Sequence, residues 1–101
     1  MNMNFIVKEH NPESENIILA IIDENLFNKE IAEGKKILDL TADFYKGEKK
    51  SKEELIHLIN RATHLNVVGT HIVEFLTKKG FIETAMTINK VPYAQITISR
   101  S

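Results

Sequence analysis

Three histidines recur at intervals of seven residues, and they are the first side chains in this sequence that could do chemistry. His57, His64 and His71 would share one face of a continuous helix, with Arg61 between the first two. Successive histidines would then lie about 10.5 Å apart, because a helix rises about 1.5 Å per residue. A single metal ion cannot bridge that distance, and the sequence has neither an HExxH motif nor a carboxylate-rich calcium loop. We therefore expect a polar helix face here and no metal site.

Catalysis by acid–base or nucleophilic chemistry needs paired carboxylates, or a base beside a nucleophile. The candidate side chains are scattered, and their spacing selects neither a dyad nor a triad; they are Asp39, Asp43, Tyr45, His64 and Tyr93. No glycine-rich phosphate loop is present, because the four glycines are dispersed at Gly34, Gly47, Gly69 and Gly80. The absence of cysteine excludes thiolate nucleophiles. These observations predict no catalytic residue and no cofactor, and they favour a binding protein over an enzyme.

The composition is that of a soluble globular protein. With 101 residues, 43% hydrophobic and 27% charged, the chain fits one domain, which we assign to residues 1–101. The longest apolar run, Ile17–Ile22, is too short to span a bilayer, and the N-terminus lacks the features of a secretory signal. We therefore expect a cytoplasmic protein without a membrane partner. A net charge of −1 does not by itself indicate nucleic-acid binding.

The segment Ser51–Phe81 carries the clearest structural signals and must position most of the histidines. Ser51 and Glu54 have the spacing of a capping box, in which each side chain accepts a hydrogen bond from the other residue's backbone N–H. Apolar residues then recur at helical spacing, at Leu55, Leu58, Ile59, Ala62 and Leu65. This pattern predicts a first amphipathic helix after Ser51.

A second helix is predicted to follow directly, after a junction at residues 65–67. Asn66 is a favourable N-cap, and the next apolar stripe consists of Val68, Ile72, Phe75 and Leu76. Gly80 can end the helix in a left-handed conformation, which would join Phe81 to Leu76 in a Schellman motif. Gly69 inside this helix would cost about 1 kcal/mol relative to alanine. Either close packing or a helix start left open for an anion would explain it.

The two ends of the chain predict β-structure. Strands at Asn4–Lys8 and Ile17–Ile22 form a hairpin, and the continuous apolar run of the second indicates a strand covered on both faces. A C-terminal hairpin joins Thr84–Ile88 to Ala94–Ser99 through residues 89–92. In its second strand alternate residues face the core, at Ala94, Ile96 and Ile98, and the others face water, at Gln95, Thr97 and Ser99.

The middle of the chain connects these parts. Asp23 is interpreted as the N-cap of a short helix that includes Ile31 and ends at Gly34. A third strand at Ile37–Leu40, a helical turn or tight loop at residues 41–47 and a charged linker at residues 48–50 follow. The predicted fold is therefore α+β, with a mixed or antiparallel sheet of about five strands packed against a helix pair. The predicted element order is β-β-α-β-α-α-β-β.

A basic face of the helix pair is the first candidate binding surface. Arg61, His64 and Lys78 could contact phosphates or an acidic partner, and such contacts position a ligand without reading its sequence. No aromatic residue is interleaved on this face, so it offers no platform for base stacking. The aromatic turn at Phe44 and Tyr45 could supply one.

Several motifs, taken together, resemble the small archaeal family catalogued as domain of unknown function 424. They are Gly34 with Ile37–Leu40, Phe44–Glu48, Ala62–Gly69, Gly80–Ile82 and Val91–Gln95. The resemblance extends from about Phe5 to Ile96, and the FYxGE and NxVG segments are its most specific parts. It implies a small α+β protein without an assigned activity, cofactor or catalytic residue, and a genomic association with translation. Relatives often have His where this chain has Tyr93, so the resemblance implies no reaction that depends on an imidazole there.

Three hypotheses for function remain open. The first is a non-catalytic module that binds RNA or ribosome-associated proteins of the translation machinery. The second is a small enzyme or ligand binder, with a pocket at the Asn66–Gly69 helix start lined by Asp39, Tyr45 and Tyr93. The third is a homo-oligomeric structural protein, such as a homodimer, because the edge strands of small sheets readily pair. The candidate binding residues are Phe44, Tyr45, Arg61, His64, Asn66, Gly69, Lys78, Pro92, Tyr93 and Gln95.

Overall fold

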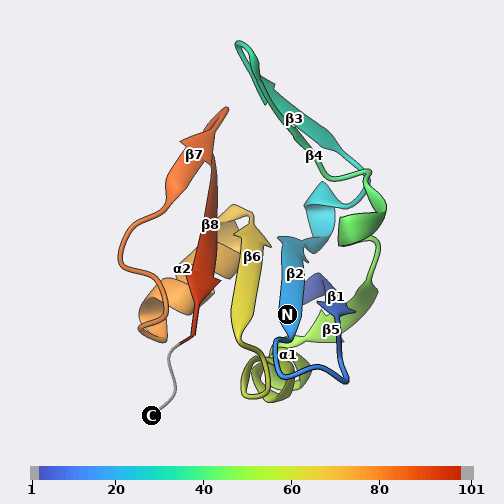
Figure 1. Ribbon diagram of the computed structural model, residues 1–101. Helices are drawn as coiled ribbons and strands as arrows, with labels where there is room; N and C mark the ends of the chain where they lie inside the picture. The colour runs from blue at the N-terminus through green and yellow to red at the C-terminus, as the bar shows by residue number, and fades with distance from the viewer. Residues whose placement is uncertain (1–2, 99–101) are drawn as a thin grey trace.

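A six-stranded mixed sheet forms the centre of the protein, whose structure, a computed structural model, describes residues 3–98 (Figure 1). The strands lie in the order β5 (Glu48–Ser51), β1 (Asn4–His10), β2 (Ile18–Asp23), β6 (His64–Val68), β8 (Val91–Thr97) and β7 (Met86–Ile88). β2 and β6 run parallel, and the other neighbours are antiparallel. The remaining elements are a separate hairpin of β3 (Glu30–Glu33) and β4 (Lys36–Asp39), the helices α1 (Lys52–Ile59) and α2 (Thr70–Lys78), and the 3-10 turns η1 (Glu24–Leu26) and η2 (Asp43–Tyr45).

This architecture confirms the predicted α+β class with a mixed sheet, but it corrects the strand count and the element order. The main sheet has six strands instead of about five, and two more strands form the β3–β4 hairpin. The observed order is β-β-β-β-β-α-β-α-β-β. No helix within residues 3–98 is long and apolar enough to cross a membrane.

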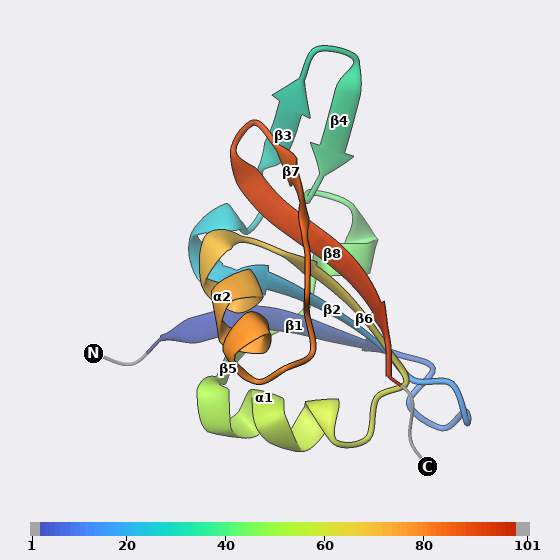
Figure 2. The same ribbon diagram turned by 90° about the vertical axis from the view of Figure 1, so that its left-hand side faces the viewer.

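Both helices cover the same face of the sheet, and the larger hydrophobic core lies beneath them (Figure 2). Leu19 and Ile21 of β2, together with Leu65 and Val67 of β6, point from the two central strands into this core and are almost completely buried. Side chains alternate between the two faces of a strand. The even-numbered residues of β2 and β6 therefore point to the opposite face.

A second, smaller core covers only part of that opposite face. There the base of the β3–β4 hairpin contributes Ile31, which packs against Ile22 and Val68 from the two central strands. The prediction that β2 is covered on both faces is confirmed for residues 19–23, which are all buried, but not for Ile18, which is partly exposed. Toward the start of β2 and β6 the hairpin no longer covers the sheet, and that part of the face is open.

The predicted start of the first helix and the predicted end of the second are confirmed. The Glu54 N–H donates to Ser51 Oγ over 3.2 Å, and the Ser51 N–H donates to Glu54 Oε1 over 3.0 Å, which completes the capping box of α1. At the end of α2 the Phe81 N–H donates to the Leu76 carbonyl over 2.9 Å. The Gly80 N–H donates to the Thr77 carbonyl over 3.1 Å, and the two bonds together form a Schellman motif.

The predicted helix–helix junction at Asn66 is wrong. α1 ends at Ile59, and residues 64–68 form β6, the strand between β2 and β8. Leu65 and Val67 satisfy the two-residue period of a strand, whereas Ala62 and Leu65 also satisfy a helical spacing. A short apolar run cannot distinguish the two periods. Long-range hydrogen bonds stabilise the strand over the helix in this segment. The first of them is donated by the Thr63 N–H to the Ile17 carbonyl over 2.8 Å.

The predicted helix between Asp23 and Gly34 is also wrong. Only the 3-10 turn η1 follows Asp23, whose side chain does not cap it. Residues 30–33 instead pair antiparallel with residues 36–39, and the predicted third strand is thus part of this separate hairpin. Gly34, with φ +60°, begins the connecting turn instead of ending a helix.

Residues 48–50, predicted as a linker, form the edge strand β5 with Ser51. β5 pairs with β1 through the register Asn4↔Ser51 to Val7↔Glu48. Gly47 permits the close approach of the two chains, because a Cβ atom there would collide with the backbone carbonyl of Val7. Two strands so far apart in sequence cannot be matched by a local pattern.

The C-terminal hairpin has the predicted partners and a tighter turn. β7 pairs with β8 from Met86↔Tyr93 to Ile88↔Val91, and only Asn89 and Lys90 connect them. Both have positive φ, 46° and 68°, as a two-residue turn of type I′ requires. Ala94 is buried and Ile96 and Ile98 are partly buried against the larger core, as predicted, whereas Ser99 lies outside the described residues.

The capping box predicts a measurable pH dependence. The backbone N–H of Ser51, followed by its hydroxyl, holds the pKa of Glu54 below its usual range. A lowered pKa in the folded state contributes stability above the unfolded pKa, about 4.3, and this contribution is lost as pH falls through the folded pKa. The stability difference between the wild type and Glu54→Gln should therefore shrink between about pH 6 and pH 3. Urea unfolding across this range measures it, and a constant difference would contradict the assignment.

Candidate nucleic-acid interface

The uncovered part of the sheet brings several predicted residues together on one surface. In the register of the central strands, Asn66 of β6 lies between Ala20 of β2 and Gln95 of β8. His64 lies in the same way between Ile18 and Thr97. We call this surface the open face and define it by the side chains of Lys8, His10, Ile18, His64, Asn66, Gln95 and Thr97. All seven are partly or fully exposed, and Figure 1 looks onto this side of the sheet.

A shallow depression lies in the open face between β2, β6 and β8. It measures about 330 Å³, and His64, Asn66 and Gln95 contribute to its lining. Two side-chain amides, each with donors and an acceptor, thus lie on neighbouring strands. His64 is oriented by Thr63, whose hydroxyl Oγ1 lies 2.9 Å from His64 Nδ1. The hydroxyl also donates to the Ile17 carbonyl, so the imidazole is held against the start of the strand.

A pair of stacked rings borders the open face beside β1. The His10 and Phe44 rings lie 4.3 Å apart with an interplanar angle of 14°. A hydrogen bond of 3.0 Å between His10 Nε2 and the Phe44 carbonyl fixes this geometry. Phe44 also meets Tyr45 edge to face, at 5.1 Å between centroids. Phe44 is partly exposed, whereas Tyr45 packs against the smaller core and burial raises the pKa of its phenol.

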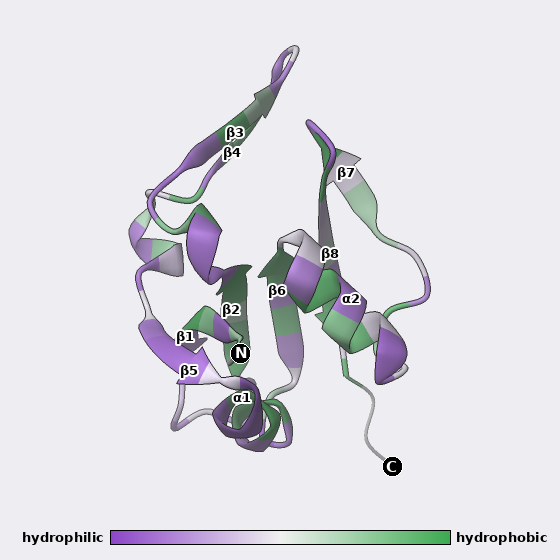
Figure 3. Cartoon of the chain, turned by 180° about the vertical axis from the view of Figure 1, so that it is seen from behind, coloured by the Kyte–Doolittle hydropathy of each residue, from purple (hydrophilic) through white to green (hydrophobic). Residues whose placement is uncertain are grey.

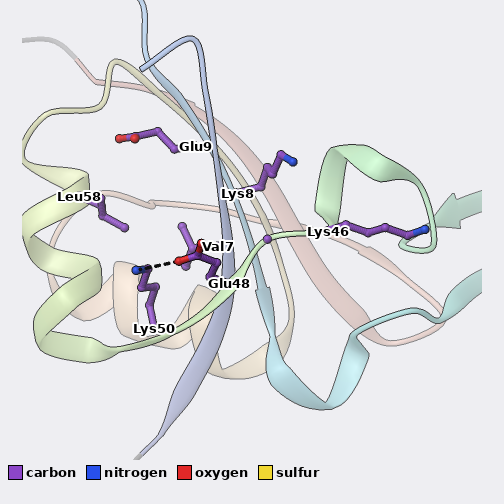
Figure 4. A pocket seen from close by; sticks show the side chains of 8 residues that line it. Val7, Lys8, Glu9, Lys46, Glu48, Lys50 and Leu58 are labelled. Atoms are coloured by element: carbon purple, nitrogen blue, oxygen red, sulfur yellow. Dashed lines mark ion pairs between the residues drawn. The ribbon is translucent and has the colours of Figure 1, made fainter. Parts of the chain in front are cut away.

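Lysines flank this aromatic pair at the edge of the sheet. A hollow of about 370 Å³ opens where β5 leaves β1 at Gly47, between this sheet edge and α1. Lys8, Lys46 and Lys50 contribute to its walls, and so do the carboxylates of Glu9 and Glu48 (Figure 4). Lys50 is paired with Glu48 at 3.3 Å, and Lys46 lies 3.5 Å from an exposed Asp43 carboxylate. Lys8, which has no ion pair among the described residues, therefore offers positive charge next to the His10–Phe44 stack. Lys46 can add to it by exchanging Asp43, because an exposed ion pair is weak.

Three of the segments that carry the family resemblance lie on the same side of the sheet, namely Phe44–Glu48, Asn66–Gly69 and Pro92–Gln95. The Gly69 N–H donates to the Pro92 carbonyl over 2.9 Å, and Val68 is paired with Tyr93, so β6 and β8 hold two segments together. Tyr93 and Tyr45, from the third segment, both pack against the smaller core. Asp39 was proposed to line a pocket together with Tyr45 and Tyr93. It lies on the exposed strand β4. Hydrogen bonds from the Thr41 hydroxyl and the Thr41 N–H hold the pKa of the Asp39 carboxyl below its usual range.

The start of α2 is already occupied by the protein's own carboxylate. Asp23, 4% exposed at the end of β2, accepts the His71 N–H over 2.9 Å and the Ile72 N–H over 2.8 Å. The His71 ring adds a third contact, with Nδ1 at 3.2 Å from Asp23 Oδ2. A Cβ atom on Gly69 would lie 2.5 and 2.7 Å from the two carboxylate oxygens. Close packing, the first of the two reasons expected for Gly69, is therefore confirmed, whereas the helix start is filled by Asp23 and is not open to another anion.

The proposed basic face of Arg61, His64 and Lys78 does not form. His64 is on the open face, whereas Lys78 is at the end of α2, on the other side of the sheet, and is paired with Glu74 at 3.1 Å. Arg61 follows α1 and is paired with Glu9 at 2.5 Å. The three histidines are likewise separated, since His57 lies on α1, His64 on β6 and His71 on α2.

Sequence reasoning missed five residues that matter here. Lys8, His10, Ile18 and Thr97 complete the open face, and Asp23 was assigned to the wrong helix. The alternation of Ile6, Lys8 and His10 was the available signal for the first two, because it continues the strand to its observed end at His10. No local signal pairs Asp23 with a helix that begins 47 residues later.

Fold and surface together define an α+β protein with a six-stranded mixed sheet, two helices on one face and an open polar area on the other. The chain belongs to the family described as "Protein of unknown function (DUF424)", which matches residues 10–98. The structure is similar to the crystal structure of an uncharacterized conserved protein from Methanopyrus kandleri, with a TM-score of 0.76 and 18% sequence identity. The match covers 97% of this chain and 96% of that one, and it establishes the common fold. No curated protein matches the sequence.

The Asp23–Gly69 contact predicts non-additive stability effects. Asp23→Ala leaves two N–H groups of α2 without their partner and should lower the free energy of unfolding by about 2–4 kcal/mol. Gly69→Ala forces a Cβ atom into the carboxylate and should cost about 2 kcal/mol or more. In the Asp23→Ala background the same glycine substitution should cost less, because the collision is gone. Urea unfolding of the four proteins measures the coupling.

Gly80→Ala is the matched control for this cycle. Gly80 also has a positive φ, 87°, but a Cβ atom there would meet nothing within 4 Å. Its replacement should therefore cost the same in the wild type and in Asp23→Ala. Equal costs for Gly69→Ala in both backgrounds would refute the proposed collision.

Proposed function

We propose that this protein is a non-catalytic module that binds single-stranded RNA through the open face, in association with the RNA or translation machinery. The charge distribution carries the proposal. The strands β1, β2, β6 and β8 contribute 14 side chains to the face opposite the helices, and none is a carboxylate. The whole chain has 14 Asp and Glu residues and a net charge of −1. A face without acidic groups is therefore a local property that suits a polyanion.

The side chains of the open face match the parts of a nucleotide. Asn66 and Gln95 can each donate to and accept from the edge of an unpaired base. The exposed part of the His10–Phe44 stack offers a ring on which a base can stack, worth about 1–3 kcal/mol per base. Lys8 and Lys46 beside it can contact phosphates. Platform, readout groups and positive charge thus lie along one path across the sheet.

Single-stranded RNA fits this path better than a duplex does. Sequence-specific proteins usually recognise RNA where its bases are unstacked, and an open sheet presents its side chains to bases laid side by side. The depression at His64, Asn66 and Gln95 is shallow, as suits a base lying on the surface. The start of α2, which a small anionic ligand would have needed, is filled by Asp23.

Fluorescence anisotropy with a labelled, mixed-sequence RNA of about 12 nucleotides tests the proposal. The wild type should bind with a dissociation constant that rises about sevenfold between about 50 and 200 mM salt, because Lys8 and Lys46 would each displace about one counterion. Phe44→Ala should weaken binding by about 5- to 100-fold, through loss of one stacking platform. Asn66→Ala should weaken it by about 5-fold or more, through loss of hydrogen bonds to a base.

Two control variants make the same chemical changes away from the open face. Phe81→Ala removes a partly exposed phenylalanine after α2, and Asn60→Ala removes an exposed asparagine at the end of α1. Both should bind RNA like the wild type. Absence of binding at about 50 mM salt and 100 µM protein would refute the proposal, since even non-specific binding is usually tighter than this. Equal losses in the controls and the open-face variants would also refute it.

A further inference from the structure

The outer edge of β8 is only partly paired. β6 pairs with one side of this strand from Tyr93 to Thr97, whereas β7 pairs with the other side only from Val91 to Tyr93. Beyond Tyr93 the second side has no neighbouring strand within the described part of the chain. In Figure 2 this edge is turned toward the viewer, with the C-terminal half of β8 uncovered.

Hydrogen bonds at the two ends of β8 fix the direction of its backbone groups. The Pro92 carbonyl accepts the Gly69 N–H over 2.9 Å, and the Ile98 N–H donates to the Thr63 carbonyl over 2.8 Å. The even-numbered residues of β8 therefore turn their backbone N–H and C=O groups toward β6. Gln95 and Thr97 turn theirs outward, where residues 3–98 supply no backbone partner.

The two long edges of the sheet differ in their protection. β5, at the opposite edge, carries Glu48, Lys49 and Lys50 and is strongly hydrophilic (Figure 3). Charged residues of this kind prevent an edge strand from pairing with another chain. The free part of β8, residues 94–98 with the sequence AQITI, has no charge and no proline, and it is rich in residues that favour strands. The β8 edge is therefore built to be paired.

We propose that a second copy of this chain pairs with the β8 edge, strand against strand, antiparallel about a twofold axis at Ile96. The pairing joins the two sheets into one of twelve strands, twice the six of one chain. This inference rests on the strand edge alone and does not depend on RNA binding.

The register of the two strands follows from the backbone N–H and C=O groups of β8 that point outward. An axis at Gln95 would pair Thr97 with Tyr93, whose outward side already faces Met86 of β7. An axis at Ile96 instead pairs Gln95 with Thr97 of the second copy, and the pairing runs from residue 94 to residue 98 and stops before Tyr93. It uses all four outward N–H groups and carbonyls of Gln95 and Thr97 in each pair. Antiparallel strands need this alternation of outward-facing and inward-facing pairs.

The sequence of the edge is complementary to itself in this register. Ala94, with its small side chain, lies opposite Ile98 of the second copy, and Ile96 lies opposite itself. The partly buried Ile96 and Ile98 thereby gain apolar neighbours on the helix side. Gln95 and Thr97 of both copies remain on the open-face side. The chain thus supplies its own matching partner strand, which is why we assign the edge to a second copy.

A single cysteine tests the register, because the chain contains no cysteine of its own. The facing Ile96 residues form a pair with Cα atoms about 4.5 Å apart, within the range of about 4.4–6.8 Å that a disulfide spans. Ile96→Cys should therefore form a covalent dimer under mild oxidation. Gln95→Cys is the control, because the axis offsets the two copies of residue 95 by about 7 Å along the strands, and it should form at least about tenfold less dimer.

The mass in solution tests the pairing without a cross-link. Sedimentation equilibrium of the full chain should give about 23 kDa, twice the 11.6 kDa of one chain. Thr97→Pro removes one outward N–H per copy and should raise the dissociation constant at least about tenfold, whereas Thr97→Val keeps that N–H and should remain a dimer. Circular dichroism checks that both variants are folded.

Three outcomes would overturn the proposal. The first is a wild type that stays at 11.6 kDa up to about 100 µM. The second is a dimer in which Gln95→Cys cross-links as fast as Ile96→Cys, since another surface or register would then hold the copies together. The third is a Thr97→Val variant that dissociates as much as folded Thr97→Pro. If Thr97→Pro does not fold, the cysteine pair decides the question alone.

Discussion

The buried carboxylate of Asp23 is the interaction on which the arrangement of the fold depends. It ends the central strand β2, receives two N–H groups from the first turn of α2 and contacts the His71 ring. Gly69 must lack a side chain for this contact to exist, so the end of β6 is fixed by the same carboxylate. Strand β2, strand β6 and helix α2 thus meet at one group. Because α2 is held on one side of the sheet there, the other side is left for the β3–β4 hairpin and the open face.

Those parts of the fold that depend on neighbouring residues could be predicted from the sequence. The capping box at Ser51, the Schellman motif at Gly80 and both terminal hairpins belong to this group. The errors concern strands whose partners are distant. β5 pairs with β1, more than forty residues earlier, and β6 lies between strands on both sides. Their short apolar or charged sequences fit a helix or a linker equally well when the partner is unknown.

In the candidate site, too, local features could be predicted from the sequence, whereas contacts between distant strands could not. His64, Asn66 and Gln95 were selected for their chemistry, and the pairing of β6 with its neighbours brings them together. Phe44 and Tyr45 lie in the predicted turn, next to this surface. Arg61 and Lys78 were grouped with His64 because a helix was assumed where a strand exists. The sheet separates them, since a strand sends successive side chains to opposite faces and a helix does not.

The parallel pairing of β2 with β6 also has a consequence for how the chain folds. Ile18 meets His64 across this pair, so the strand at the centre of the sheet waits for a segment 46 residues further along the chain. The β1–β2 hairpin can form early, but until β6 is made it exposes an apolar edge from Ile18 to Ile22. Pairings across such distances are slow, and they leave uncovered edges prone to aggregation. During synthesis the chain therefore passes through a vulnerable interval that ends only when β6 has left the ribosome.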